Sequence, residues 1–202
     1  MTTTDPEACG FPRIFSWLEQ ALSACKPYSA EFSGLTPAAV VLLLWMQEKE
    51  PYLLLIRRSK SLHLHPGEIA FPGGRKDPLD PNLQATALRE LQEEVGISPS
   101  KTRLLGRLKQ DFSFSGFSIA PFVCFLRSSP VFSPNEEVKE ILPMPLGQFS
   151  IEDFAPEERR FMGRIVQSWR VETQHGPIWG ATARILRGFL LFMREHGILL
   201  GA

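Results

Sequence analysis

Apolar residues recur at three- and four-residue spacing in three segments, which predicts three amphipathic helices. They lie at residues 11–25, 82–95 and 179–196. Asp80 is the expected N-cap of the second helix, with Pro81 at its first position and Gly96 as a left-handed C-cap. Pro27 prevents extension of the first helix, and a linker rich in Ser, Gly and Pro over residues 28–37 separates it from the rest.

Apolar, partly β-branched runs predict strands. They cover residues 38–47, 52–58, 104–112, 119–126 and 164–172. The short polar break between the first two predicts an antiparallel hairpin, whose first strand is apolar enough to be buried on both faces. A short run at residues 68–71 precedes the breaker Pro72-Gly73-Gly74. This order of elements favours an α/β (α+β) fold layered around a mixed sheet.

Composition and charge exclude several classes of protein. The chain has 22 Lys+Arg against 22 Asp+Glu, and this zero net charge argues against a general nucleic-acid coat. The longest wholly apolar run, residues 38–46, is far shorter than the roughly 20 residues that span a bilayer. Residues 1–10 lack the pattern of a signal peptide, and the 3 cysteines form no CxxC pair. We therefore expect a cytoplasmic protein without a membrane or nucleic-acid partner.

Three glutamates share one side of the helix at residues 82–95. A rotation of about 100° per residue places Glu90, Glu93 and Glu94 within an arc of roughly 100°, and Leu91 and Val95 lie on the apolar side. Like charges at this spacing near a helix C-terminus are destabilising, and a hard divalent cation would relieve the repulsion. A solvated acidic face is the alternative, and the helix taken alone favours it.

The neighbouring sequence favours the cation site over the solvated acidic face. Gly74 and the run Arg89-Glu90-Leu91-Gln92-Glu93-Glu94-Val95-Gly96-Ile97 resemble the Nudix box, Gly-x5-Glu-x7-Arg-Glu-U-x-Glu-Glu-x-Gly-U, where U is aliphatic. The second half matches at every fixed position. In the first half, Pro81 occupies the position of the first Glu and one residue is inserted, so Asp77 or Asp80 is expected to replace the missing acid.

Residues 54–67 and the turn at residues 71–74 are similar to the upstream signature of one branch of this family, the coenzyme A pyrophosphatases. Residues 178–184 also look like that branch. Two positions depart from its pattern: Ile56 stands where the signature has Thr, and His63 where it has Arg. The second change matters because a guanidinium can bind phosphate bidentately, whereas a neutral imidazole cannot.

The resemblance implies a Nudix-type α/β/α sandwich with a central mixed β-sheet over residues 37–202, preceded by a helix and linker at residues 1–36. It also implies Mg²⁺ or Mn²⁺ as cofactor. Glu90 and Glu94 are the expected first ligands, Glu93 a further ligand or the group that orients water, and Gly73 a carbonyl donor. The spacing leaves open which glutamate is the catalytic base.

Three further groups have two interpretations each. Arg89 either forms an ion pair that holds the preceding loop, which is favoured, or contacts the substrate. Glu137 is either a solvated loop charge, which is favoured, or a distal acid near the metal. The aromatic stripe of Phe112, Phe114 and Phe117 is either packing, which is favoured, or an adenine platform.

Arg58, His63 and His65 lie in or beside the loop before the glycine turn, where they are expected to bind a phosphate-rich substrate. The two histidines alternate with one residue between them, so they would face the same side of an extended segment. Zinc is a weaker alternative, because two histidines without a third ligand rarely make a site.

We therefore expect a metal-dependent hydrolase that cleaves the diphosphate of coenzyme A or acyl-CoA to (acyl-)4′-phosphopantetheine and adenosine 3′,5′-bisphosphate. Its partner is a small-molecule nucleotide, and a homodimer is a possible assembly. One alternative is a Nudix diphosphatase for another nucleoside diphosphate compound, such as ADP-ribose, a dinucleotide or a nucleoside triphosphate. Another is a non-catalytic nucleotide sensor, which the three intact glutamates disfavour.

Overall fold

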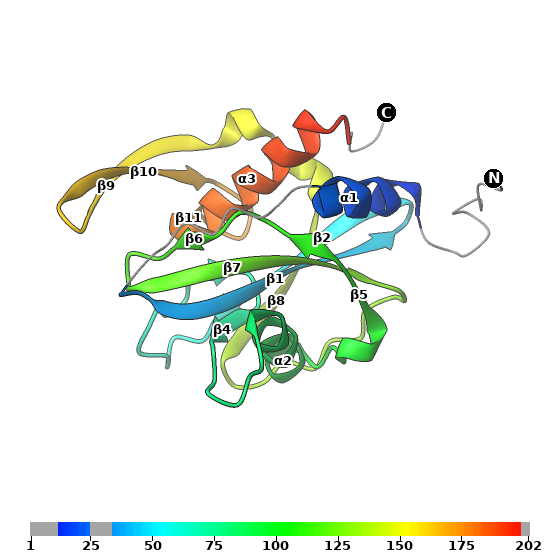
Figure 1. Cartoon of the computed structure of the whole chain (residues 1–202), viewed down its shortest axis with the longest axis horizontal. Coiled ribbons are helices and arrows are strands. Elements are labelled where there is room, and N and C mark those ends of the chain that lie inside the picture. The colour runs from blue at the N-terminus through cyan, green and yellow to red at the C-terminus, as the bar shows by residue number, and fades with distance from the viewer. Residues whose placement is uncertain (1–11, 25–33, 199–202) are drawn as a thin grey trace.

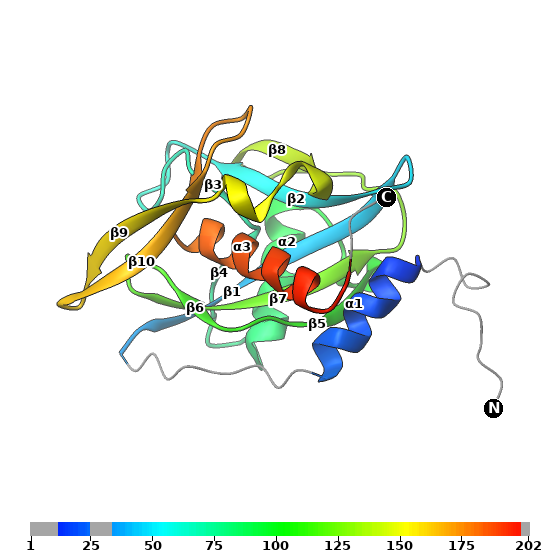
Figure 2. The ribbon, with the colours of Figure 1, turned by 90° about the horizontal axis from the view of Figure 1, so that it is seen from above.

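Helices cover both faces of a mixed β-sheet in the computed structural model of the chain, which describes residues 12–24 and 34–198 (Figure 1). Helices α1 (Arg13–Ala24) and α3 (Gly180–Glu195) lie on one face, and α2 (Leu83–Val95) lies on the other. Seen from above, α3 crosses the middle of the sheet and α1 lies over its β5 side (Figure 2). The predicted α/β/α sandwich with a central mixed sheet is confirmed.

The sheet is mixed because one central pair of strands is parallel and the others are antiparallel. Its strand order is β3-β2-β1-β7-β5, with β4 also paired to β1, β6 to β7 and β8 to β2; β11, β10 and β9 form a second, three-stranded sheet. The bounds are β1 (Thr36–Gln47), β2 (Glu50–Arg58), β3 (Ile69–Ala70), β4 (Gly73–Arg75), β5 (Thr102–Arg107), β6 (Asp111–Phe112), β7 (Phe117–Leu126), β8 (Val138–Pro145), β9 (Ala155–Phe161), β10 (Arg164–Val171) and β11 (Ile178–Trp179). Short 3₁₀ turns lie at Pro99–Lys101, Leu146–Gln148 and Ile151–Asp153.

Strand β1 contributes to the hydrophobic core on both of its faces. Leu42 and Leu44 belong to the cluster between the sheet and helices α1 and α3. The alternating residues Val41, Leu43 and Trp45 belong to the cluster under α2. All five are at most 1% exposed, which confirms the prediction of a strand buried on both faces.

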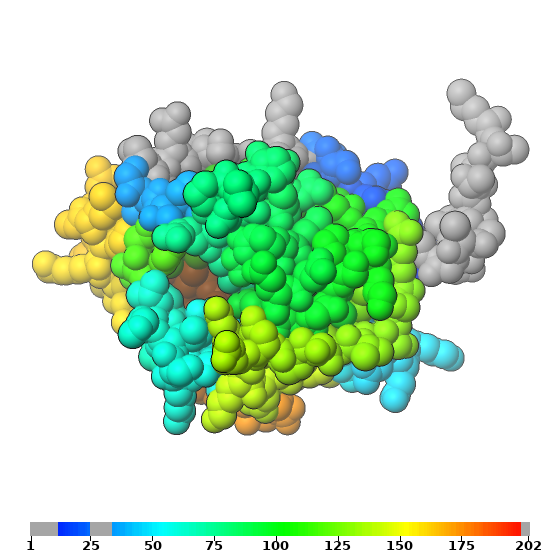
Figure 3. Space-filling model, turned by 90° about the horizontal axis from the view of Figure 1, so that it is seen from below, coloured from blue at the N-terminus to red at the C-terminus, as the bar shows by residue number. Residues whose placement is uncertain are grey.

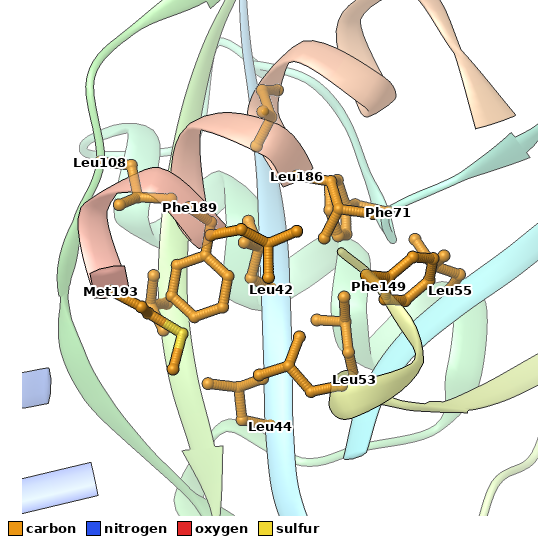
Figure 4. Packing of buried hydrophobic residues seen from close by; sticks show 14 of the residues in the cluster. Leu42, Leu44, Leu53, Leu55, Phe71, Leu108, Phe149, Leu186, Phe189 and Met193 are labelled. Carbon is orange, nitrogen blue, oxygen red and sulfur yellow. The ribbon is translucent and has the colours of Figure 1, made fainter. Parts of the chain in front are cut away.

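Helix α3 supplies a continuous apolar face to the first of these clusters. Leu186, Phe189 and Met193 of α3 belong to one cluster with Leu42 of β1 and Leu53 of β2, and Figure 4 shows these side chains among its members. All five side chains are at most 3% exposed. Burying side chains of this size contributes roughly 1.5–3 kcal/mol each, so the C-terminal helix is held firmly on the sheet.

The N-cap prediction for α2 is wrong. The cap is Asn82, whose Oδ1 accepts the Ala85 amide at 2.9 Å, and the helix begins at Leu83 rather than Pro81. The Asp80 carboxylate is unavailable because Arg89 binds it. The predicted C-cap is confirmed: Gly96 has a φ of 76° and its amide donates to the Gln92 carbonyl.

Several strand predictions need correction. The predicted strand at residues 104–112 is two strands, β5 and β6, separated at residues 108–110, and the predicted linker at residues 28–37 overlaps the start of β1. Strands β4, β8, β9 and β11 were not predicted, and the helix predicted from Trp179 begins at Gly180. Pro143 and Pro145 argued against a strand at β8. Proline is nevertheless compatible with a strand at the sheet edge, and β8 lies on the outer side of β2. The polar sequence of β9 forms a strand through its pairing with β10.

The structure bears on two expectations from composition, which concern membrane-spanning helices and the cysteines. None of the helices in the described residues combines the length and the hydropathy that a bilayer crossing requires. Of the cysteines, Cys9 and Cys25 lie outside the described residues. Cys124 is buried in β7, where desolvation raises the pKa of its thiol to about 12.

Helix α1 is amphipathic, as predicted, and its apolar side packs on the main sheet. Phe15, Leu18 and Leu22 are at most 3% exposed and belong to the cluster that α3 covers. Arg103 of β5 binds Glu19 at 2.7 Å. The division of the chain at residues 36 and 37 stays a prediction, and a variant on this helix can test it.

Leu18→Ala is expected to lower the free energy of unfolding of the whole chain by about 2–4 kcal/mol, because it leaves a cavity in the core. Chemical denaturation followed by circular dichroism measures this change. Ser23→Ala, at an exposed position of the same helix, is the control and should leave the midpoint unchanged. An unchanged midpoint for Leu18→Ala would mean that α1 is energetically separate from the sheet.

Candidate functional site

A cleft of about 660 Å³ opens beside α2. In Figure 3 it is the hollow whose floor carries the colour of the β11–α3 junction, with the cyan residues of the 60s on its rim. Its walls come from β1, the loop after β2, the β3–β4 turn, α2, the turn at residues 113–117, the loop at Glu137, and the junction of β11 and α3. Its volume is within the range of small-molecule sites.

Gly73 and Gly74 allow the chain to run very close to both β1 and α2. Gly73 pairs with Val40 and has a φ of 152°, and an added Cβ would lie 2.3 Å from the Ala39 carbonyl oxygen. A Cβ on Gly74 would lie 2.4 Å from Oε1 of Glu90. The glycines therefore place backbone directly against a carboxylate of α2.

Glu94 is buried behind the glycine turn, with 2% of its surface exposed. Its Oε2 accepts the Gly73 amide at 2.8 Å, and Nη1 of Arg58 lies 3.6 Å from its Oε1. Burial raises the pKa of Glu94 to about 8; the Gly73 amide opposes this rise, and the neighbouring Glu90 adds to it. Its neighbours therefore compensate the negative charge of ionised Glu94 only in part, and the neutral form is favoured.

The three glutamates therefore differ in environment, although the helical wheel places them on one side. Burial raises the pKa of Glu90, which lines the cleft, and Arg89 opposes this rise. Glu93 also lines the cleft, but its side chain is 54% exposed. Glu94 lies deepest.

Arg58 points toward Glu94 because β2 is irregular at its end. The register between β2 and β8 shifts between Arg57 and Arg58, and the Ser59 amide donates to the Glu137 carbonyl at 2.7 Å. A bulge of this kind redirects a side chain. Arg58 lines the cleft, and its buried Nε has no hydrogen-bond partner among the described residues.

Arg89 holds the loop before α2 and the acidic side of the helix together. Its Nε and Nη2 bind Asp80, each at 3.1 Å, its Nη2 lies 3.0 Å from Glu90, and its Nη1 lies 2.8 Å from Glu93. Nη2 also donates to the Arg75 carbonyl. Of the two interpretations of Arg89, the geometry supports the ion pair, and Asp80 is the acid that forms it.

The two histidines lie in different surroundings. His65 lines the cleft, with Nδ1 3.0 Å from Glu68 and Nε2 2.8 Å from Oγ of Ser115. His63 is exposed and is not among the residues that line the cleft. The two histidines were expected to face the same side of an extended segment. The loop is bent instead, and His65 has a φ of 57°.

Sequence reasoning missed part of the cleft wall. Trp179 and Ile185, from the β11–α3 junction, line the cleft together with Phe114 and Phe117. The branch-like run at residues 178–184 was the available signal. Glu137 also lines the cleft, and its charge helps to raise the pKa of both Glu90 and Glu94.

The donors fit a hard divalent cation in charge and chemistry. They are carboxylate oxygens beside a glycine turn, and the charge of Glu94 is undercompensated. Within the described ranges, no three His, Cys, Asp or Glu side chains are already gathered as a metal site. Arg89 binds Glu90 and Glu93, whereas Glu94 accepts the Gly73 amide, so the three carboxylates have different partners.

Several known proteins are similar to this chain in sequence or in fold. The profile of the NUDIX domain matches residues 34–165. A protein described as uncharacterized Nudix hydrolase NudL, from Pectobacterium atrosepticum, is 40% identical over 163 residues, which cover 78% of this chain and 83% of that protein. A Yersinia pestis protein with the same description is 38% identical over 165 residues, covering 79% of this chain and 81% of that protein.

Among solved structures, a MutT/nudix family protein from Enterococcus faecalis has a TM-score of 0.52. The match covers 96% of this chain and 76% of that chain, at 14% sequence identity. At this level of identity the similarity concerns the fold alone.

Asp80→Asn is expected to destabilise the protein at neutral pH by about 1–3 kcal/mol, because it leaves the Arg89 guanidinium partly unpaired. The hydrogen bond from Arg89 lowers the pKa of Asp80 from 3.8 to about 2. The stabilisation is therefore complete above about pH 4 and is lost as the pH falls through the folded-state value.

Urea denaturation at a series of pH values tests this. The stability difference between wild type and Asp80→Asn should shrink between about pH 4 and about pH 2. Asp77→Asn is the control in the same loop, because Asp77 accepts the Leu79 amide at 2.8 Å rather than binding Arg89. A difference that stays constant over this range would contradict the role given to the ion pair.

Proposed function

Since this chain belongs to the Nudix hydrolase family, we propose that it hydrolyses the diphosphate bond of coenzyme A or acyl-CoA. The products are (acyl-)4′-phosphopantetheine and adenosine 3′,5′-bisphosphate. The observation that carries the hydrolase proposal is the Glu94 carboxylate, which is buried against the Gly73 amide with Arg58 3.6 Å away. The coenzyme A assignment rests on the similarity of residues 54–67, 71–74 and 178–184 to that branch.

Glu90, Glu94 and the Gly73 carbonyl would hold Mg²⁺ or Mn²⁺. When bound, the ion would neutralise the diphosphate, polarise a phosphoryl oxygen and lower the pKa of a bound water. Glu93, the most exposed of the three glutamates, is the residue to which we assign the orientation of water. Arg89 then acts as a positioning residue, since its guanidinium is engaged by Asp80 and by the glutamates.

Arg58 is the best-placed group for a phosphate oxygen. It lines the cleft, and its Nε lacks a partner among the described residues. A guanidinium can donate two parallel hydrogen bonds to such an anion. His65 lies on the rim of the same cleft and is the second candidate for substrate contact.

One observation favours a second candidate substrate. His63 replaces the arginine of the branch signature and lies outside the cleft lining, so no guanidinium is present at that position. If this weakens the hold on coenzyme A, another nucleoside diphosphate compound such as ADP-ribose becomes the preferred substrate.

A substrate panel tests both candidates. The full chain is incubated with Mg²⁺ or Mn²⁺ and coenzyme A, acetyl-CoA, ADP-ribose or a dinucleoside polyphosphate, and product masses are read with and without chelator. Masses of phosphopantetheine and adenosine 3′,5′-bisphosphate, lost with chelator, are expected. Intact coenzyme A beside rapid cleavage of ADP-ribose would overturn the substrate assignment, and no cleavage in any reaction would overturn the hydrolase.

Glu94→Gln should reduce metal-dependent turnover by about 100-fold or more, because it removes one ligand charge from the site. Steady-state kinetics with titrated Mg²⁺ provides the measurement. Glu195→Gln, at the exposed end of α3, is the matched control and should keep full activity. Turnover that survives in Glu94→Gln would show that this residue is wrongly assigned.

Gly74→Ala is expected to weaken Mn²⁺ binding by about tenfold, because its Cβ would displace the Glu90 carboxylate that lies 2.4 Å away. Titration followed by electron paramagnetic resonance measures the affinity without requiring turnover. Gly147→Ala is the control, since its Cβ would meet no atom within 4 Å. Equal Mn²⁺ affinity in the two variants would place the ion away from Glu90.

A further inference from the structure

Arg184 is the most extensively bonded cation on the C-terminal helix, and it lies outside the residues that the family profile matches. Its side chain is 10% exposed. Nε lies 3.1 and 3.2 Å from the two carboxylate oxygens of Asp111, and Nη1 lies 3.2 Å from Oγ of Ser168. Nη2 donates to the Phe112 carbonyl. One guanidinium thus joins α3, β6 and β10.

The same guanidinium lies under an aromatic cluster. Its carbon is 4.7 Å from the ring centre of Phe112 and 5.1 Å from that of Phe114. Phe112 stacks on Phe161 of β9 with centres 4.8 Å apart, and Phe114 meets both rings edge to face. Phe114 is the member of this cluster that lines the cleft. Its orientation is therefore fixed from several sides.

The cleft contains two kinds of wall. Glu90 and Arg58 provide charge for a diphosphate and its cation, whereas Phe114 and Trp179 provide flat apolar surface. A nucleoside diphosphate compound has two matching parts, a charged diphosphate and a flat base. A ring that is already held in place binds a planar base at a lower entropic cost than a mobile side chain does.

We infer that Arg184 is a positioning residue, which fixes Phe114 as the wall that binds the nucleobase of the substrate. The inference rests on the proposed function, because it needs a substrate with a base. The planar fork of arginine is required, since a lysine could not bond Asp111, Ser168 and the Phe112 carbonyl together. Contacts to a remote base contribute to substrate binding rather than to the chemical step, so their loss should raise KM.

Kinetics on the full chain test the inference with the substrate that the panel identifies. Arg184→Lys and Phe114→Ala should each raise KM by about tenfold, the effect of losing one base–aromatic contact, and leave kcat within about twofold. Arg194→Lys is the matched control, because Arg194 is exposed and binds Glu152 at 3.2 Å on the surface. Its KM should stay at the wild-type value.

Binding without turnover separates this inference from the proposed function. Isothermal titration with adenosine 5′-monophosphate and with ribose 5-phosphate compares ligands that differ by the base. Both variants should weaken binding of the nucleotide by about tenfold and leave binding of the sugar phosphate unchanged. This comparison remains valid even if the wild type hydrolyses none of the panel compounds.

Three results would overturn the inference. The first is an unchanged KM in folded Phe114→Ala and Arg184→Lys. The second is a fall in kcat at constant KM, which would place the effect on the chemical step. The third is equal weakening of nucleotide and sugar phosphate. Thermal unfolding identifies any variant that is unfolded at the assay temperature, and Phe114→Ala, at the cleft surface, then decides the question.

Discussion

The candidate site depends on the hydrogen bond between the Gly73 amide and the buried carboxylate of Glu94. This bond joins the glycine turn to α2 and holds a carboxyl group at a position where burial raises its pKa to about 8. Such a carboxylate is costly unless an opposite charge compensates it. Arg58 provides part of that compensation at 3.6 Å. The turn, the helix and the end of β2 must therefore be placed correctly relative to one another for the site to exist.

The sandwich supplies these positions from both sides of the sheet. Helix α2, under one face, provides the glutamates, whereas β11 and α3, on the other face, provide the apolar end of the cleft through Trp179 and Ile185. Arg89 and Arg184 are bonded in a similar way in the two halves, since each binds an aspartate and contacts side chains that line the cleft. The two halves share the sheet, and their relative placement follows from the two apolar clusters packed against it.

Much of the fold was predictable because its strongest signals are local. The apolar periodicity of α2 and α3, the Gly96 cap and the two-sided burial of β1 all follow from short segments of sequence. The errors occur where contacts between segments distant in sequence determine the local structure. Asn82 rather than Asp80 caps α2, because Arg89 binds the Asp80 carboxylate. Strand β8 accommodates prolines because it lies at the edge of the sheet. His63 and His65 lie in different surroundings because their loop is bent. Likewise, a helical wheel groups Glu90, Glu93 and Glu94 but cannot reveal which of them the glycine turn will bury.

The parallel pairing of β1 with β7 also has a consequence for how the site is assembled. It joins residues 36–44 to residues 117–125, and the chain between them includes β2, the glycine turn and all of α2. Contacts between segments so distant in sequence close a long loop and form slowly compared with a helix or a hairpin. Helix α2, which carries the glutamates, can thus form early. Strand β1, against which Gly73 packs, gains its pairing with β7 only when this long loop has closed. We therefore expect the geometry of the candidate site to be completed late in folding.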